Sequence, residues 1–168
     1  MSSSQSTPHR TRTFTWDDPL QGAEAAKSMS GLDYLHAMLA GKLPSPPIGH
    51  ALDFKGVEAS EGRAVFEFTP QEFHYNPIGS VHGGVITTLM DSAMGCAVHS
   101  TLPAGTGYTT LELKVNFIRG IGKNTGPLQC IGTMIQGGGR IALSEAKLVD
   151  ARGRLYAHGT STCLILRP

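Results

Sequence analysis

The longest apolar stretch of this chain lies near its centre and has the length of a helix. From Gly83 to Val98, only Asp91 and the weak acid Cys96 have ionisable side chains. Apolar side chains fall on nearly all sides of such a helix, so other structure must cover nearly all of its surface. The pattern predicts a long buried helix over residues 83–98, which ends before Pro103.

On both sides of this helix the hydrophobic period changes to two, which is typical of strands. Residues 64–69 alternate between the two faces of a strand, and residues 51–58 are its expected hairpin partner. Four further segments have strand-like patterns: 108–118, 127–136, 140–150 and 154–166. The last two flank a tight turn that ends at Gly153, where glycine permits a positive φ.

The N-terminal part of the chain is polar and rich in helix breakers. Residues 1–27 are therefore expected to form a flexible tail, and residues 28–168 a single domain. A short helix is expected to follow Ser30, which with Asp33 has the form of a capping box. It should end near Gly41.

The expected order is one short helix, two strands, one long helix and four strands. Strands that follow one another without helices between them favour an α+β fold with an antiparallel sheet. Two arrangements would cover the long helix on all sides. One is a strongly curved sheet wrapped around it, and the other is a sheet on one side and a partner subunit on the other.

Composition and charge exclude several kinds of partner. The 168 residues include 14 lysines and arginines and 13 acidic residues, for a net charge of +1, which gives no electrostatic reason to expect a nucleic-acid partner. No apolar run reaches the roughly 18 uncharged residues of a membrane-spanning helix, and the N-terminus has no signal-peptide core. Three distant cysteines and seven scattered histidines show no metal-ligand spacing. We expect a cytoplasmic protein with reduced thiols, no metal and no cofactor.

Asp91 is the first candidate for chemistry, because it is a carboxylate within an apolar helix. Charged helix residues are usually exposed or paired with a base, and either would explain Asp91 without a function. Its helical neighbours are Thr87, Thr88, Met94 and Gly95, none of which is a cation. An acid without a local ion pair in such surroundings favours a catalytic role.

The helix opens with His82-Gly83-Gly84, which leaves backbone N–H groups bare at its start. Glycines there can simply permit a turn or close packing. The functional interpretation is an oxyanion hole, in which the Gly83 N–H stabilises negative charge on a carbonyl oxygen. His82 would orient this turn or donate a hydrogen bond, although a lone histidine is more often structural.

The spacing of these two candidates has a geometric consequence. Gly83 and Asp91 are eight residues apart, or roughly 12 Å along a helix. A carboxylate and an oxyanion donor must both lie within about 3 Å of one reacting centre. If both serve one site, Gly83 of one subunit must approach Asp91 of another. Catalysis by these residues therefore predicts a dimer with two shared sites related by a two-fold axis.

Three weaker candidates have ordinary structural explanations of comparable or greater weight. Asn76 lies with Gly79 in the loop before His82, where turn chemistry explains both. Thr110 lies on the polar face of a strand, where β-propensity explains it. Gly138, Gly139 and Arg140 form a glycine-rich turn that could be merely flexible, or could hold a phosphate through backbone N–H groups and Arg140.

Two segments together resemble the signature of the PaaI-like hotdog-fold thioesterases: Asn76-x-x-Gly79-x-x-His82-Gly83-Gly84 and Asp91-x-Ala93-x-Gly95-x-Ala97. The likeness covers roughly residues 30–166. It implies that a curved antiparallel sheet wraps around the central helix, that two chains join their sheets, and that dimers pair further into tetramers. The implied substrate is an acyl-coenzyme A thioester.

The resemblance also implies roles for individual residues. Asp91 would be the nucleophile or the general base that activates water. The Gly83 N–H would polarise the thioester carbonyl, and His82 would support that turn. Asn76 would position the carbonyl or the water, and Thr110, or Thr109 beside it, would assist the water. The expected substrate-binding residues are Gly84, Gly138, Gly139 and Arg140.

Two other functions remain open on the sequence. One is a hotdog hydratase or dehydratase, in which a histidine pairs with an acid in another local pattern; an acid nine residues after His82 favours hydrolysis. The other is a non-catalytic acyl-CoA-binding regulator, which would carry an additional DNA-reading or partner-binding segment. Residues 1–50 contain one short helix and few basic residues, which argues against it.

Overall fold

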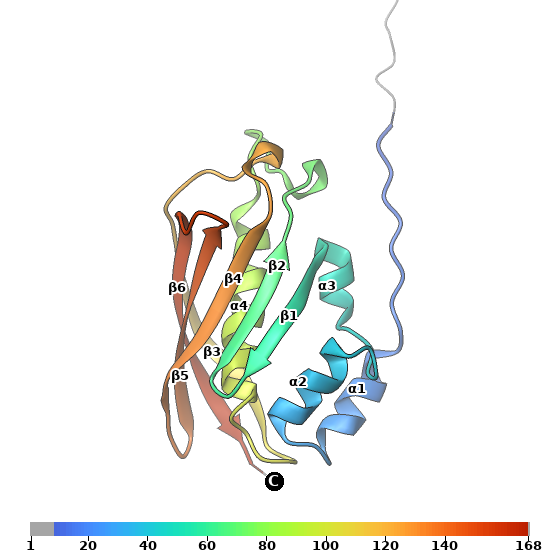
Figure 1. The fold of residues 1–168 in the computed structure, drawn as a ribbon, viewed down its shortest axis with the longest axis vertical. Helices are drawn as coiled ribbons and strands as arrows, with labels where there is room; N and C mark the ends of the chain where they lie inside the picture. The colour runs from blue at the N-terminus through green and yellow to red at the C-terminus, as the bar shows by residue number, and fades with distance from the viewer. Residues whose placement is uncertain (1–8, 168) are drawn as a thin grey trace, which may run out of the picture.

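The fold is a curved antiparallel sheet wrapped around one long helix, α4, which spans Gly83–His99 (Figure 1). The computed structural model describes residues 9–167. Six strands form the sheet in the order β1-β2-β4-β5-β6-β3, and all neighbours are antiparallel. Their bounds are Phe54–Ser60 (β1), Arg63–Phe68 (β2), Gly107–Phe117 (β3), Leu128–Gly137 (β4), Ile141–Asp150 (β5) and Leu155–Leu166 (β6). This confirms the expected α+β hotdog architecture.

Helix α4 forms the centre of the core, as its apolar sequence predicts. Leu89, Met90, Ala93, Met94 and Ala97 are fully buried on it. All of these except Ala97 belong to one core cluster with apolar side chains from the inner face of the sheet. The predicted bounds, 83–98, agree with the observed helix to one residue.

The backbone of α4 lies unusually close to the middle of the sheet, on β4. A methyl group at Gly132 of β4 would lie 2.2 Å from the carbonyl oxygen of Ala93 on α4. At Gly159 of β6, a methyl group would lie 3.1 Å from Met90 and 2.7 Å from the carbonyl oxygen of Lys114. Glycine is therefore required at Gly132 by a close approach of two backbones, and this contact sets the distance between helix and sheet.

Three shorter helices precede the sheet and lie on the side of β1 (Figure 1). They are α1 (Pro19–Ala26), α2 (Gly31–Leu39) and α3 (Pro47–Leu52). The expected helix after Ser30 is confirmed as α2, with the Ser30 hydroxyl accepting from the Asp33 N–H. Beyond these, the described chain has two single-turn 3-10 helices, η1 (Glu72–His74) and η2 (Lys123–Thr125).

Two of these helices correct the sequence-based expectations. Helix α1 falls within residues 1–27, which were expected to lack regular structure; Asp18 caps it and Pro19 begins it. Helix α3 occupies the proline-rich segment that was interpreted as a break, and it delays β1 from residue 51 to Phe54. Proline suits the first turn of a helix, where its missing N–H has no intrahelical partner, so a proline pair can begin a helix as well as end one.

The chain before α1 is also attached to the domain. The Arg12 guanidinium donates to the carbonyl oxygens of His50 and Ala51 at the end of α3. It also lies over the ring of Phe73, 4.1 Å from the ring centroid. Residues 1–8 of the expected tail lie outside the described chain.

His74 fastens the loop that leads into α4. Its Nδ1 accepts from the Gln71 N–H at 2.9 Å, and its Nε2 donates to the carbonyl oxygen of Leu52 at 2.8 Å. The side chain is buried, and burial lowers the pKa of His74 below its usual value. The neutral imidazole is therefore the form that fits this loop.

We predict that Gly132→Ala destabilises the protein by about 3 kcal/mol, because the added methyl group overlaps the backbone of α4. The matched control is Gly139→Ala, where the same methyl group would meet no atom within 4 Å. Chemical denaturation of both variants measures the change in unfolding free energy. Equal stability of the two variants would contradict the close contact.

A second prediction concerns acid stability. His74 has a lower pKa in the folded chain than in the unfolded chain, so the unfolded state binds more protons below about pH 6.5. Stability from this group is therefore complete above that pH and declines as the pH falls further. Thermal unfolding from pH 7.5 to 5.5 should show a smaller loss of stability in His74→Gln than in wild type. An equal loss in both proteins would show that protonation of His74 does not cause the loss of stability in acid.

Candidate active site

Asp91 lies halfway along α4, on the side where the curved sheet leaves the helix open. Its carboxylate is partly buried, and Oδ1 accepts a hydrogen bond of 2.9 Å from the Thr110 hydroxyl of β3. Within residues 9–167, no lysine, arginine or histidine forms an ion pair with it. Of the two neighbouring threonines, Thr110 donates this hydrogen bond, whereas Thr109 is exposed.

A cavity of about 770 Å³ opens beside Asp91. Asp91, Ser92 and Cys96 of α4 form one side, with Tyr108 and Thr110 of β3. The opposite side comes from α2, α3, β1 and β2, including Leu35, Met38, Leu39, Ile48, Phe54 and Phe66. The cavity therefore joins a carboxylate to mainly apolar walls, which suits a ligand with a reactive polar end and an apolar body.

The turn before α4 has the structure expected of a bare helix start. The His82 side chain caps the helix, with Nδ1 accepting from the Gly84 N–H at 2.9 Å. The Gly84 N–H is thus engaged within the chain. For the Gly83 N–H, by contrast, the described residues provide no hydrogen-bond acceptor. Gly83 lies against Phe117, because a methyl group at Gly83 would be 3.0 Å from the Phe117 ring.

Asn76 organises the loop that precedes this turn. Its Oδ1 accepts from the backbone N–H groups of Ile78 and Ser80, both at 3.1 Å, and its Nδ2 donates to the Ser80 hydroxyl at 3.0 Å. Gly79 has a φ of 84°, which favours glycine there. In a single chain these contacts give Asn76 and Gly79 the turn chemistry that was one of their two interpretations.

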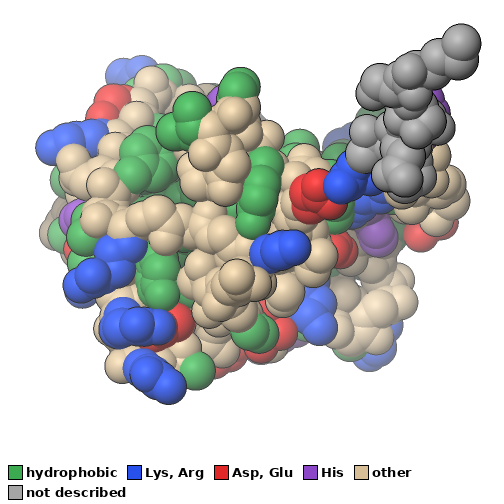
Figure 2. All heavy atoms as spheres, turned by 90° about the horizontal axis from the view of Figure 1, so that it is seen from above, with side chains coloured by type: hydrophobic (Ala, Val, Ile, Leu, Met, Phe, Trp, Pro, Cys, Tyr) green, Lys and Arg blue, Asp and Glu red, His purple; other side chains and the backbone are tan. Residues whose placement is uncertain are grey.

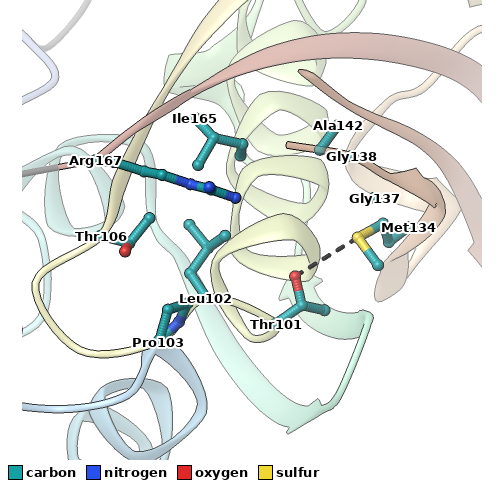
Figure 3. Close-up of a pocket in the computed structure, with 10 residues that line it drawn as sticks. All are labelled: Thr101, Leu102, Pro103, Thr106, Met134, Gly137, Gly138, Ala142, Ile165 and Arg167. Atoms are coloured by element: carbon teal, nitrogen blue, oxygen red, sulfur yellow. Dashed lines mark hydrogen bonds between the residues drawn. The ribbon is translucent and has the colours of Figure 1, made fainter. Parts of the chain in front are cut away.

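The glycine-rich turn between β4 and β5 lies elsewhere. Gly138 lines a second cavity of about 530 Å³ beyond the C-terminal end of α4, with Thr101 and Arg167 (Figure 3). Figure 3 shows the Arg167 side chain extending across this cavity, with Thr106 and Ile165 on either side of it. Gly138, Gly139 and Arg140 do not line the cavity beside Asp91, so a single chain does not bring the two groups together.

Two residues at the cavity were missed by sequence reasoning. Burial, and to a lesser extent Asp91, raise the pKa of Cys96 to about 12, so its thiol stays protonated and is a poor nucleophile. Tyr108 reaches over Gly95 from β3, and its hydroxyl oxygen would lie 2.6 Å from a methyl group there. The space beside Gly95, one helical turn after Asp91, is therefore occupied by the tyrosine.

Three further features of the described chain bear on its possible functions: metal ligands, membrane-spanning helices and surface charge. Within the described chain, no three His, Cys, Asp or Glu side chains are placed to hold a metal ion. None of its helices is both long enough and apolar enough to cross a membrane. The face shown in Figure 2 carries basic, acidic and apolar side chains close to one another.

Comparisons with known proteins agree on one family. The model of the thioesterase superfamily matches residues 78–157. A provisionally named esterase of Saccharolobus solfataricus is 33% identical over 116 residues, which make up 69% of this chain and 81% of that protein.

Solved structures support the same assignment. A provisionally named thioesterase of Ralstonia eutropha JMP134, described as related to phenylacetic acid degradation, is 26% identical. It aligns with a TM-score of 0.70 over 78% of this chain and 98% of its own. The E. coli PaaI protein, from the phenylacetic acid degradation operon, is 20% identical and shares the fold with a TM-score of 0.69, over 82% and 95% of the two chains. The family match, the relatives and the hotdog architecture together establish that this chain belongs to the thioesterase superfamily, as a PaaI-like hotdog-fold thioester hydrolase.

Proposed function

We propose that this protein hydrolyses an acyl-coenzyme A thioester to the free acid and coenzyme A, with Asp91 as the catalytic carboxylate. The observation that carries the proposal is the setting of Asp91. It has no cationic partner in the described chain, Thr110 holds one of its oxygens, and it opens onto a cavity with mainly apolar walls. If the role of Asp91 were a structural ion pair, a cationic side chain would lie beside its carboxylate.

In the proposed reaction, Asp91 acts as general base towards water. Water attacks the thioester carbonyl carbon while Asp91 takes a proton from it, and the carbonyl π electrons move to oxygen. The Gly83 N–H at the positive end of α4 stabilises that oxyanion. The oxyanion then reforms the carbonyl, the carbon–sulfur bond breaks, and the thiolate takes the proton from Asp91. The Thr110 hydrogen bond keeps the carboxylate directed at the water.

The two catalytic groups are proposed to come from different subunits. Within one α4 they lie roughly 12 Å apart, too far to reach one carbonyl. Strand β3 connects them: Asp91 contacts Thr110 near its start, and Gly83 contacts Phe117 at its end. Asp91 and Gly83, which are separated along α4, therefore also contact separate positions along β3.

Strand β3 also has the properties of a dimer edge. It pairs with β6 on one side, and within the described chain no strand pairs with its other side. Leu111, Phe117 and Ile118 at this edge are 56%, 58% and 49% exposed. In a two-fold antiparallel pairing centred near Leu113, Thr110 would lie close to Phe117 of the partner subunit. Asp91 would then approach Gly83 of the partner subunit, and the apolar edge would be covered.

The role of Asp91 has a direct test. Asp91→Asn removes the base without changing the size of the side chain, and should lower kcat by about a hundred- to ten-thousandfold. The measurement is thiol release from a panel of acyl-CoAs. Asp17→Asn is the matched control, because it makes the same change at an exposed residue that does not line this cavity. Undiminished turnover in Asp91→Asn would contradict the mechanism.

The shared site is tested by mixing two inactive variants. Gly83→Pro removes the N–H at the first helical position, where proline is tolerated, and the ψ of 134° at His82 suits a residue before proline. Dimers of Gly83→Pro or Asp91→Asn alone should be nearly inactive. A mixed dimer would contain one site with both native groups, so an equal mixture should recover about a quarter of wild-type activity.

The outcome distinguishes shared sites from sites within one subunit. If Asp91 and Gly83 of the same chain worked together, every mixed dimer would lack one group at each site and no activity would return. Gly83→Ala keeps the N–H and adds a similar contact with Phe117, so it controls for crowding. A protein that remains monomeric at assay concentration and is fully active would also contradict the shared site.

A further inference from the structure

Tyr108 lies at the start of β3 and directs its hydroxyl at the face of α4 that carries Asp91. The hydroxyl oxygen would be 2.6 Å from a methyl group at Gly95, so only glycine leaves it this space. Gly95 follows Asp91 by four residues, which is about 6 Å along the helix axis. Tyr108, Asp91 and Thr110 line the same cavity. The tyrosine hydroxyl therefore lies roughly one helical turn from the catalytic carboxylate.

The hydroxyl of Tyr108 has no protein partner within residues 9–167. The neighbouring His99 ring, with its centroid 5.5 Å from that of Tyr108, packs against it without a hydrogen bond. Burial, and to a lesser extent the nearby cysteines and Asp91, raise the pKa of Tyr108 well above its usual value. The group is thus a neutral donor on a partly buried side chain that lines the cavity, and it is free to pair with a ligand.

The walls around this hydroxyl carry no charge that could serve an ionised acyl group. Leu35 and Met38 of α2 and Phe66 of β2 are apolar, and the Cys96 thiol is protonated. Two basic side chains line the cavity: His50 is exposed, and Lys55, whose side chain is 75% exposed, pairs with Glu67 at 3.8 Å. An acyl group that carries a carboxylate at its far end would therefore lose hydration in this cavity without gaining an enclosed cation.

We propose that the acyl group of the substrate occupies this cavity and that Tyr108 is its polar partner, so that the enzyme prefers an uncharged acyl group with an apolar body and one hydroxyl or carbonyl oxygen. The oxygen would lie about 6 Å from the thioester carbon, because the tyrosine hydroxyl is one helical turn from Asp91. Tyr108 is a specificity-determining residue, which acts on the acyl group and takes no part in the chemical step. This inference rests on the proposed acyl-CoA hydrolysis.

The test uses two substrates that differ by one oxygen: octanoyl-CoA, and an octanoyl-CoA with a hydroxyl about five carbons from the thioester carbon. Wild type should have the higher kcat/KM on the hydroxylated substrate. Tyr108→Phe removes only the hydroxyl, and should lower kcat/KM on that substrate by about two- to tenfold, mainly through KM. The parent substrate should be hydrolysed by Tyr108→Phe at least as well as by wild type.

Each control answers a separate question. Tyr34→Phe makes the same change on a tyrosine outside the cavity lining, and should leave the substrate preference unchanged. An acyl-CoA with a terminal carboxylate should be a poor substrate for all variants. Equal losses on both octanoyl substrates in Tyr108→Phe would overturn the inference, as would a wild type without preference. The ratio of kcat/KM on the two octanoyl substrates is measured on one preparation of each variant. Partial unfolding lowers both values equally, so it does not change this ratio. Failure of wild type to hydrolyse either substrate, with no other acyl-CoA turned over, would instead contradict the proposed function.

Discussion

The close packing of α4 against the middle of the sheet is the contact on which the other features of this protein depend. The backbone of α4 touches β4 at Gly132, where no side chain separates them. With the helix this near, the strands on either side can curve around it and bury its apolar residues. The apolar helix and the curved sheet therefore require each other, since neither could cover its own surface alone.

The same packing leaves one side of α4 open, and the candidate site lies there. The sheet ends at β1 on one side and at β3 on the other, and the cavity beside Asp91 lies between these edges. Helices α2 and α3 close part of the opening with apolar side chains. A carboxylate on the open side of α4 remains accessible to a ligand, whereas on any covered side it would be buried in the core without a partner.

Two residues, His82 and Asn76, stabilise the backbone near the candidate site and contribute to the site only indirectly. His82 caps α4 and uses the Gly84 N–H, which leaves the Gly83 N–H as the bare donor of the turn. Asn76 holds its own loop together. Both therefore act within one chain as supports for the start of α4, and the proposed chemistry is carried by Asp91 and Gly83.

Periodicity along the sequence was enough to predict the central helix, the order of the strands after it and the isolation of Asp91, because these depend on neighbours a few residues apart. Helix spacing alone also separated Gly83 from Asp91 by roughly 12 Å. The tertiary structure decided three other features: the contact of Thr110 with Asp91, the position of Tyr108 over Gly95, and the cavity walls from α2 and α3. Each of these depends on strand register and on the crossing of distant segments, which no local pattern encodes.

Helix α3 was missed for a related reason, since a proline pair marks a break in one setting and the start of a helix in another. The sequence by itself determined that Asp91 and Gly83 are candidates and cannot meet within one helix, and only the fold decided which side chains surround Asp91.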